Sequence, residues 1–428
     1  MKICVFGLWH LGTVTAACLA SKGCEVIGLD ADRKVVEELK KGKPPIYETG
    51  LSELIGGGIS SGKLAFTTDP KIALQNADLL WVAFDTPVKQ NDEGDPGVVI
   101  QQVVKIFPFI QDKQIVLISS QLPVRSTTNL ATKFQKRFPQ KKVSFFYSPE
   151  NLRLGKAIET FLNAERVIVG SAGGRKNDFL EPLFCLWTDN IIWMSVESAE
   201  MVKHAVNAYL ATSIAFTNEI SSICEKIGAD AGEVEQGLRS ESRIGKKAYV
   251  KAGEAFAGGT LARDLNFLSL LGKKNKVETF LIRNVSTSND LHKGWALRKL
   301  KECFKNLSQK KIAILGLSYK SGSDVIRQSN ALVIAELLKK HKASAVGFDR
   351  FVKKLPNSLA SKIRLVDSYE KALKDADAVL ITAEFGKDTE LLPAQIERMR
   401  ERIVLDPNGF YPNLKNNPEI RYFSVGKL

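Results

Sequence analysis

The same local pattern, a short apolar strand that ends in glycine, occurs at the start of the chain and again in its last third. Residues 2–6 precede Gly7, and the pattern restarts at 311–315 before Gly316. A strand that turns through glycine into a helix opens the βαβ units of doubly wound α/β domains. The sequence therefore predicts two such α/β units.

Further apolar segments of strand length follow each of these starts. In the first part of the chain the predicted strands are Lys2–Phe6, Glu25–Leu29, Leu79–Ala83, Gln114–Ile118, Ser144–Tyr147 and Arg166–Gly170. In the last part they are the strand of the strand-glycine pattern Lys311–Leu317, which ends before Gly316, and Ala345–Phe348, Ala378–Ile381 and Ile403–Leu405. Between them, residues 196–238 form a long amphipathic pattern without proline, with serine and acidic residues at its start. We expect an α/β protein with two Rossmann-like, doubly wound parallel-sheet domains joined by a long central helix, with boundaries at 1–195, 196–300 and 301–428.

The size and composition of the chain are typical of a multi-domain globular protein. Its 428 residues exceed what one hydrophobic core ordinarily holds. No apolar run reaches the roughly 20 residues that cross a bilayer, and the opening segment is too short for a signal-peptide core, so we expect a cytoplasmic protein. The six cysteines and four histidines are scattered without metal-ligand spacing, so we expect neither a disulfide framework nor a bound metal.

The formal net charge of +14 indicates anionic partners. Nucleic acid is a poor candidate, because the lysines are spread along the chain and no aromatic-basic module for base stacking is present. A small substrate with a diphosphate would suit a basic cleft equally well. Part of the excess charge could simply keep the protein in solution.

The segment after the first strand is typical of a dinucleotide-binding turn. Gly7-Leu8-Trp9-His10-Leu11-Gly12 precedes an apolar helix, and Asp30 ends the second strand. In such a fold the helix N-terminus faces the pyrophosphate and the acid binds the ribose hydroxyls, which favours NAD over NADP. Trp9 stands where a glycine is expected, and that glycine lets the backbone approach phosphate closely. The sequence predicts an NAD site, and the alternative is a nucleotide-fold domain that has lost its ligand.

Over nearly its whole length the sequence resembles the UDP-glucose/GDP-mannose dehydrogenase family. The segments that carry the resemblance, in their shared order, are Pro45-Ile46-Tyr47-Glu48-Thr49-Gly50-Leu51, Thr86-Pro87 with Asp95, Tyr147-Ser148-Pro149-Glu150-Asn151-Leu152-Arg153-Leu154-Gly155, Lys203 with Asn207, Arg243-Ile244-Gly245, and Lys320 with Arg327. This family oxidises C6 of a nucleotide-sugar to a carboxylate in two NAD-dependent steps, the second through a cysteine thiolate. The resemblance implies NAD as the cofactor, a nucleotide-sugar as the substrate, a homodimer joined through the central helix, and a pathway such as polysaccharide biosynthesis.

The resemblance also implies which residues are catalytic. Lys203 and Asn207 lie one turn apart on one helix face, and their counterparts stabilise the oxyanion that develops at C6. Asp264 would act with Lys203 on the active-site water, and Glu150 would serve in acid–base work or thioester hydrolysis. The structural alternatives are a solvated helix face for the first pair and a turn-capping carboxylate for Glu150.

The remaining residues of the predicted site bind ligands. The glycine turn and the resemblance together predict the cofactor-binding residues. These are Gly7, Trp9, His10, Leu11, Gly12, Asp30, Thr86, Pro87, Gln121 and Arg327. The resemblance also predicts the residues that bind the nucleotide-sugar, which are Leu152, Arg153, Arg243, Tyr249, Lys251, Gly253 and Lys320. It implies that Arg243 reaches across from the partner subunit and that Lys320 and Arg327 lie near the diphosphate. For Lys251 an ordinary surface lysine is the alternative.

The main departure from the family falls on its nucleophile. Residues 255–264 align with the family's G-F-G-G-S-C-F-P-K-D, and Thr260 takes the place of the cysteine. A threonine hydroxyl supplies no ready anion at neutral pH and is β-branched, so it is a poor nucleophile without a dedicated base. Three further family residues are replaced: the threonine that holds the catalytic water by Gln121, a glutamate by Leu154, and an arginine by Asn408.

Three functions remain compatible with these residues. The first is oxidation at C6 that yields the aldehyde, or the acid through the aldehyde hydrate, without a covalent intermediate. The second is the full four-electron oxidation of UDP-glucose to UDP-glucuronate by a route that uses Thr260 or water. The third is a nucleotide-sugar-binding protein, or a partner subunit, without redox turnover.

Overall fold

A computed structural model describes residues 1–428 except 88–93, 151, 154, 320–323, 385–392 and 428. The chain divides into two compact units, Met1–Ala205 and Val206–Leu428. Helix α9, Val196–Ile227, begins in the first unit and continues into the second. No helix in the described part of the chain is long and apolar enough to span a membrane.

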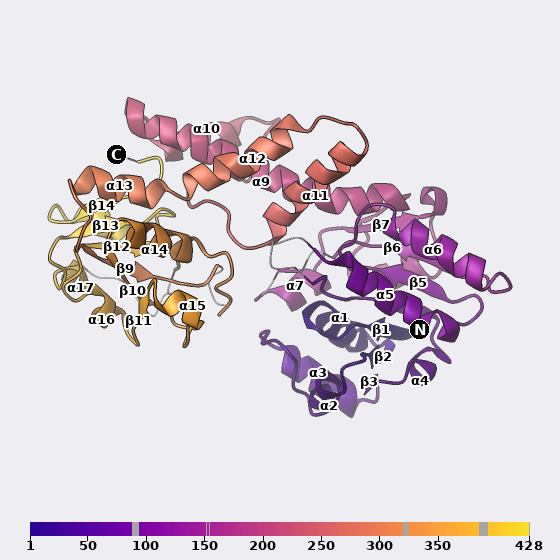
Figure 1. The fold of residues 1–428 in the computed structure, drawn as a ribbon. Coiled ribbons are helices and arrows are strands. Elements are labelled where there is room, and N and C mark those ends of the chain that lie inside the picture. The colour runs from indigo at the N-terminus through magenta and orange to yellow at the C-terminus, as the bar shows by residue number, and fades with distance from the viewer. Residues whose placement is uncertain (88–93, 151, 154, 320–323, 385–392, 428) are drawn as a thin grey trace. The chain divides into compact units, whose positions relative to one another are not determined.

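The first unit is built on one sheet with strand order β3-β2-β1-β4-β5-β6-β7-β8 (Figure 1). The strands are β1 Lys2–Phe6, β2 Glu25–Leu29, β3 Leu64–Thr67, β4 Leu79–Val82, β5 Ile115–Ile118, β6 Ser144–Tyr147, β7 Val167–Ser171 and β8 Ile191–Ser195. Neighbouring strands are parallel except β6 and β7, which pair antiparallel at Tyr147 and Gly170. The central strands are buried on both faces, which is why they read as continuous apolar runs.

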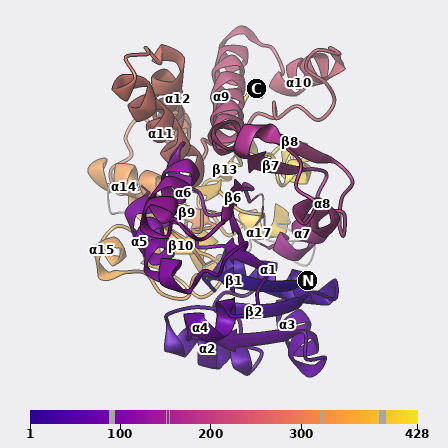
Figure 2. The same cartoon turned by 90° about the vertical axis from the view of Figure 1, so that its right-hand side faces the viewer.

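Helices cover both faces of this sheet and bring their N-termini to the carboxyl ends of its strands (Figures 1 and 2). One apolar core lies under α1 His10–Ser21, α2 Arg33–Lys40, α3 Leu51–Ser60, α7 Ala157–Leu162 and α8 Leu180–Phe184. The core on the other face lies under α4 Pro70–Leu74, α5 Pro96–Ile106, α6 Ser126–Arg137 and the start of α9. Ligands of doubly wound sheets bind at the carboxyl edge, where the strand order reverses between β1 and β4.

The second unit repeats this topology after a set of helices. Its sheet has the order β11-β10-β9-β12-β13-β14, with all neighbours parallel. The strands are β9 Lys311–Leu315, β10 Ser344–Phe348, β11 Arg364–Leu365, β12 Ala378–Ile381, β13 Ile403–Leu405 and β14 Arg421–Phe423. The helices are α10 Ala231–Ser240, α11 Thr260–Lys274, α12 Phe280–His292, α13 Trp295–Cys303, α14 Asn330–Lys340, α15 Asn357–Ala360, α16 Tyr369–Leu373 and α17 Pro393–Ile396. Helices α13 and α14 pack on one face of the sheet, and α16 and α17 on the other.

The predicted fold class is confirmed, with corrections to its elements. Two strands of the first sheet, β3 and β8, and two of the second, β11 and β14, were not predicted. The helix predicted over 196–238 is wrong in its second part, because α9 ends at Ile227 and Gly228 adopts the left-handed φ of +81°. Asp230 then accepts a hydrogen bond from the Gly232 amide at 2.6 Å and starts α10 as a separate helix.

Candidate active site

The first glycine turn has the close backbone approach that a dinucleotide fold requires. Gly7 has a φ of +95°, which favours glycine. A Cβ atom on Gly12 would lie 1.6 Å from the Gly7 carbonyl oxygen, so no side chain fits at this position. Helix α1 therefore begins directly against the end of β1, with its first amides aimed beyond the sheet edge.

Asp30 lies at the end of β2, where the acid that holds the adenosine ribose is expected. Its Oδ2 accepts a hydrogen bond from the Leu8 amide at 2.6 Å, and its Oδ1 accepts one from the Asp32 amide at 2.9 Å. These bonds tie the glycine turn to the second strand and fix the carboxylate at the sheet edge. The turn and Asp30 fit the ribose and pyrophosphate of NAD.

Two features of this site depart from a standard dinucleotide site. Trp9, at the N-cap of α1, is 47% exposed, so its ring lies at the surface and not in the core. Asp85, which sequence analysis missed, accepts a hydrogen bond from the Leu11 amide at 3.0 Å. The signal that could have found it is an acid directly before Thr86-Pro87, at the carboxyl end of β4.

His10 and Glu48 join the start of α1 to two surface segments. The His10 Nε2 atom lies 3.1 Å from Glu48 Oε2, and the Glu48 carboxylate accepts hydrogen bonds from the amides of Gly155 and Ala157, each at 2.9 Å. Burial of Glu48 opposes its charge, but these amide bonds outweigh burial and hold the pKa of the carboxyl below its ordinary value. Residues 45–51, one of the segments that carry the family resemblance, are thus held by hydrogen bonds to the loop before α7 and to its first residue.

The ends of β4 and β5 bring three predicted cofactor residues together. The Thr86 hydroxyl donates to the Gln121 carbonyl at 2.6 Å, and the Pro87 carbonyl accepts from the Asp95 amide at 2.7 Å. These loops stand at the carboxyl edge of the sheet beside the glycine turn, because β4 pairs with both β1 and β5.

The Lys203 ammonium group pairs with Glu150 in the first unit. Its Nζ atom lies 3.1 Å from Glu150 Oε1 and donates to the Glu150 carbonyl at 2.6 Å. Glu150 Oε2 also accepts from the Leu152 amide at 2.8 Å. Only 11% of the Lys203 side chain is exposed, so the solvated-face alternative for Lys203 is wrong.

Helix α9 also holds the loop after β5 through two buried residues. The Glu200 carboxylate accepts from the amides of Arg125 at 2.5 Å and Thr127 at 2.9 Å, at the start of α6. His204 Nε2 lies 3.2 Å from the Leu122 carbonyl oxygen. Glu200, Lys203 and His204 thus lie within little more than one turn of α9 and hold the loops that carry Gln121 and Glu150.

In the second unit Asn207 and Asp264 form a buried pair. The Asn207 Nδ2 atom donates to Asp264 Oδ2, and the Asp264 side chain is fully buried. The buried position of Asn207 rules out a solvated helix face for this residue too. Lys203 and Asn207 lie one turn apart on α9, as predicted, with Lys203 in the first unit and Asn207 in the second.

Thr260 begins α11 and is exposed. The glycine before its N-cap, Gly258, has a φ of +73°, and a Cβ atom there would lie 2.6 Å from the Tyr319 ring. None of the six cysteines stands at this position, and Cys4, Cys18 and Cys24 are buried in the first unit. Burial raises the pKa of Cys18 to about 12, so that thiol stays protonated.

The loop before Thr260 is held by side-chain amides through its backbone. Asn218 accepts from the Gly253 amide at 3.1 Å, and Asn289 both accepts from the Phe256 amide at 2.8 Å and donates to its carbonyl at 3.0 Å. Further bonds to this loop run from His292 Nε2 to the Gly253 carbonyl at 2.8 Å, from Asn330 to the Ala255 carbonyl at 2.7 Å, and from the Glu254 amide to Asn408 at 3.0 Å. These side chains satisfy backbone groups of a segment that has no regular secondary structure.

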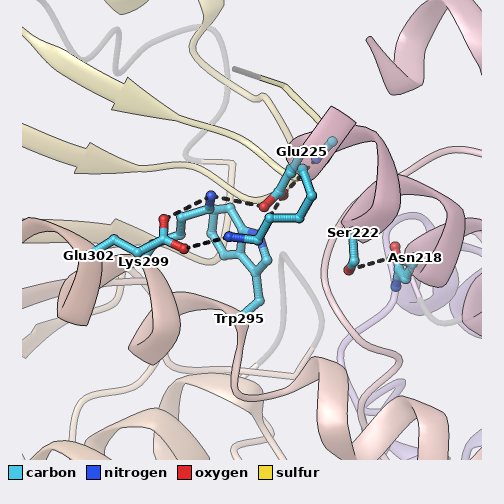
Figure 3. A network of polar contacts seen from close by, with 8 residues as sticks. Asn218, Ser222, Glu225, Trp295, Lys299 and Glu302 are labelled. Atoms are coloured by element: carbon cyan, nitrogen blue, oxygen red, sulfur yellow. Dashed lines mark hydrogen bonds and ion pairs between the residues drawn. The ribbon is translucent and has the colours of Figure 1, made fainter. Parts of the chain in front are cut away.

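A polar network beside Asn218 anchors α13 to α9 (Figure 3). Glu225 accepts from Trp295 Nε1 at 2.8 Å and pairs with Lys299 at 2.9 Å, and Lys299 also pairs with Glu302 at 3.2 Å. Lys226, which follows Glu225 in α9, pairs with Glu302 at 3.1 Å. The pairing of Lys299 with two carboxylates outweighs the desolvation that opposes its charge and raises the pKa of Lys299.

The substrate residues implied by the resemblance are mostly exposed. Arg243 is exposed and pairs with Glu241 at 2.9 Å, and Tyr249, Lys251 and Arg153 are also exposed, as is Arg327, which the resemblance assigns to the cofactor. Gly253 is buried against Asn408, whose Oδ1 would lie 2.4 Å from a Cβ atom at this position. Lys320 and Leu154 lie outside the described residues. In the described part of the chain, no group of three or more potential metal ligands comes together.

Comparisons with known proteins show the family to which the chain belongs. Residues 1–188, 197–291 and 313–413 match, respectively, the NAD binding, central and UDP binding domains of the UDP-glucose/GDP-mannose dehydrogenase family. The chain is 30% identical to the UDP-glucose 6-dehydrogenase YwqF of Bacillus subtilis, over 100% of this chain and 98% of that protein. It is 31% identical to a UDP-glucose 6-dehydrogenase of Rickettsia bellii, over 100% of this chain and 99% of that protein. Among solved structures, a UDP-glucose dehydrogenase from Pyrobaculum islandicum matches with a TM-score of 0.87 and 27% identity, over 100% of this chain and 98% of that chain.

Proposed function

Because the chain belongs to the UDP-glucose/GDP-mannose dehydrogenase family, we propose that it oxidises the C6 alcohol of a nucleotide-sugar with NAD and without a covalent thioester. The observation that carries this proposal is the retention of two polar pairs, Lys203 with Glu150 and the buried Asn207 with Asp264, while Thr260 occupies the nucleophile position. A UDP-sugar is the substrate class that the matched UDP binding domain favours.

The first oxidation needs groups that this chain retains. NAD, held by the glycine turn and Asp30, would accept a hydride from the C6 alcohol, whose hydroxyl proton would pass to a base as its oxygen becomes a carbonyl. We assign the stabilisation of negative charge on that oxygen to the Lys203 ammonium and the Asn207 amide, since preorganised donors of this kind contribute strongly to catalysis. Glu150, held against Lys203, is the residue we assign to proton transfer.

The second oxidation, where it occurs, needs no covalent bond to the protein. Water would add to the aldehyde to give a hydrate, and the hydrate would give a hydride to a second NAD and a proton to a base, which yields the acid. Thr260 cannot replace the thiolate in this step, because its hydroxyl stays protonated near neutral pH. The aldehyde, or the acid formed through its hydrate, is therefore the expected product.

The test is an incubation of the protein with NAD and a panel of nucleotide-sugars, with the NADH formed per sugar, the product and the mass of the denatured protein all measured. We expect NADH formation with at least one sugar, no mass increase on the protein, and activity that persists after thiol alkylation. A sugar adduct on Thr260 would contradict the proposal and favour the full reaction through a covalent intermediate.

The departures at the NAD turn favour a second candidate, a nucleotide-sugar-binding protein without redox turnover. Asp85 accepts a hydrogen bond from an amide that faces the pyrophosphate in this fold, and Trp9 replaces the glycine that lets the backbone approach phosphate closely. This candidate predicts binding of a nucleotide-sugar without NADH formation at any NAD concentration. Calorimetry with UDP and UDP-sugars, run beside the NADH assay, separates it from the first.

We also propose that the protein is a cytoplasmic homodimer joined through α9. Four large apolar side chains, Tyr209, Phe216, Ile223 and Ile227, are exposed along this helix. Their spacings are close to multiples of the helical repeat, so they share a face. Sedimentation of the wild type and of Phe216→Glu tests this, and a wild-type monomer at micromolar concentration would contradict it.

A further inference from the structure

The amides at the start of α1 are already occupied by a carboxylate of the same chain. Asp85 Oδ2 lies 3.0 Å from the Leu11 amide nitrogen, and the His10 amide also donates to this carboxyl group. These are the second and first residues of α1, whose amides have no partner within the helix. In the family fold that this chain shares, the same amides face the pyrophosphate of the dinucleotide.

A carboxylate and a pyrophosphate cannot share this place. Both are anions that use the same donors, and two like charges at contact distance repel each other more strongly near a protein surface than in bulk water. The turn offers little room to shift, because Gly12 lies against the Gly7 carbonyl. Bound NAD therefore requires the Asp85 carboxyl group to leave.

The surroundings of Asp85 allow such a movement by the side chain alone. The next residue is fixed, since the Thr86 hydroxyl is bonded to the Gln121 carbonyl at 2.6 Å. Residue 85 itself is exposed, so its side chain can rotate into water without disturbing the core. Although the residue is exposed, its carboxyl group is crowded at the helix end, and desolvation together with the nearby Glu150 raises its pKa. The charged carboxylate is thus held less firmly than a helix cap in open solvent.

We propose that Asp85 is an internal competitor for the NAD pyrophosphate: its carboxylate caps α1 when the site is empty and must swing away before NAD binds. Asp85 then lowers NAD affinity while it stabilises the empty site. The inference rests on NAD as the cofactor and is independent of the sugar and of the number of oxidation steps.

The test compares NAD binding by calorimetry, with ADP-ribose as a second probe, for the wild type and for Asp85→Asn and Asp85→Ala. Asp85→Asn removes the charge and keeps the shape, whereas Asp85→Ala removes both. Asp78→Asn is the matched control, because Asp78 accepts from the Lys2 amide at 2.8 Å at the opposite end of the same strand, β4. Thermal melting of the ligand-free proteins is measured in parallel.

We expect both Asp85 variants to bind NAD and ADP-ribose about 10-fold more tightly or better, with Asp78→Asn unchanged. We expect ligand-free Asp85→Ala to melt at a lower temperature than the wild type, since it loses a helix cap. Equal or weaker NAD binding by Asp85→Asn, or no binding by any of the proteins, overturns the inference. Tighter binding by the variants without NADH formation from any sugar would uphold the inference and reject the proposed oxidation.

Discussion

At the residue scale, the substitution at position 260 decides which chemistry is open to the chain. We expect Thr260→Cys to introduce covalent capture of the aldehyde, because a thiolate is strongly nucleophilic and leaves readily. The helix N-terminus at α11 would further favour the thiolate. The expected result is a sugar adduct detectable by protein mass, with acid as the product where the wild type releases aldehyde.

Thr260→Ser is the control for this experiment, since it keeps a hydroxyl and loses only the methyl group. Thr260→Ser should form no adduct and retain the product distribution of the wild type. If Thr260→Cys behaves like Thr260→Ser, then the missing thiol is not what limits the reaction.

Lys203 supplies the charge on which the proposed oxidation depends. We expect Lys203→Met to lower kcat by about 100-fold or more, since removal of a preorganised donor to a developing oxyanion has an effect of that size. Lys226→Met is the matched control on the same helix, because Lys226 is exposed and pairs only at the surface with Glu302. A kcat for Lys203→Met within a few-fold of the wild-type value would contradict a catalytic role for Lys203.

How far single residues could be predicted from the sequence depended on whether their partners were near in the chain. The turn around Gly12 and the acid Asp30 were predicted because spacing alone defines them. Asp85 was missed because its partner, the Leu11 amide, lies far away in sequence and is brought close only by the pairing of β1 with β4. The pair of Lys203 with Glu150 could not be derived from the residues alone for the same reason.

At the element scale, the loop 253–256 is held by hydrogen bonds from side chains and not by the backbone hydrogen bonds of a β-sheet. Asn289 makes two buried hydrogen bonds to the Phe256 backbone. We expect Asn289→Ala to lower the free energy of unfolding by about 2–3 kcal/mol, because it leaves a buried amide and a carbonyl without partners. Urea denaturation measures this change.

Asn284→Ala on the same helix is the control, since the Asn284 side chain is exposed and bonds only to a carbonyl of its own helix. It should change the free energy of unfolding by less than about 0.5 kcal/mol. Equal effects of the two substitutions would show that the bonds to the loop contribute nothing particular to stability.

Elements with strong periodic patterns were predictable, whereas short elements were not. The buried strands β1 and β4 are continuous apolar runs and were found. The edge strands β3 and β11 contain only four and two residues, so they carry little signal of their own. The break after Ile227 was missed because the apolar pattern continues past Gly228, and the left-handed conformation of that glycine ends the helix all the same.

At the scale of the whole molecule, we expect two carboxyl groups of the second unit with raised pKa values, Glu254 and Asp406, to make its stability depend on pH. Desolvation raises the pKa of Glu254 from 4.5 to about 8, and the nearby Asp406 adds to the shift. Burial raises the pKa of Asp406 as well. Asn408, two residues after Asp406, accepts a hydrogen bond from the Glu254 amide at 3.0 Å, so both carboxyl groups lie where the loop 253–256 meets the segment after β13.

The sign of the effect follows from proton uptake. Between pH 4.5 and about 8 the folded state holds a proton on Glu254 that the unfolded chain has lost, so the free energy of unfolding falls as the pH rises through this window. We expect Glu254→Gln, which is neutral at every pH, to flatten this fall and to be more stable than the wild type above pH 8 by on the order of 2 kcal/mol.

Urea denaturation at a series of pH values from 5 to about 9 measures the two profiles, with Glu336→Gln as the control. Glu336 is an exposed carboxylate that pairs with Lys362 at 3.0 Å, and this pairing lowers its pKa, so its removal should leave the slope in this window unchanged. Parallel profiles for Glu254→Gln and the wild type would mean that Glu254 is ionised in the folded protein throughout. In that case the hydrogen bonds to Asn330 and Asn408 would stabilise its charge, and the loop would be held by a carboxylate instead of a neutral acid.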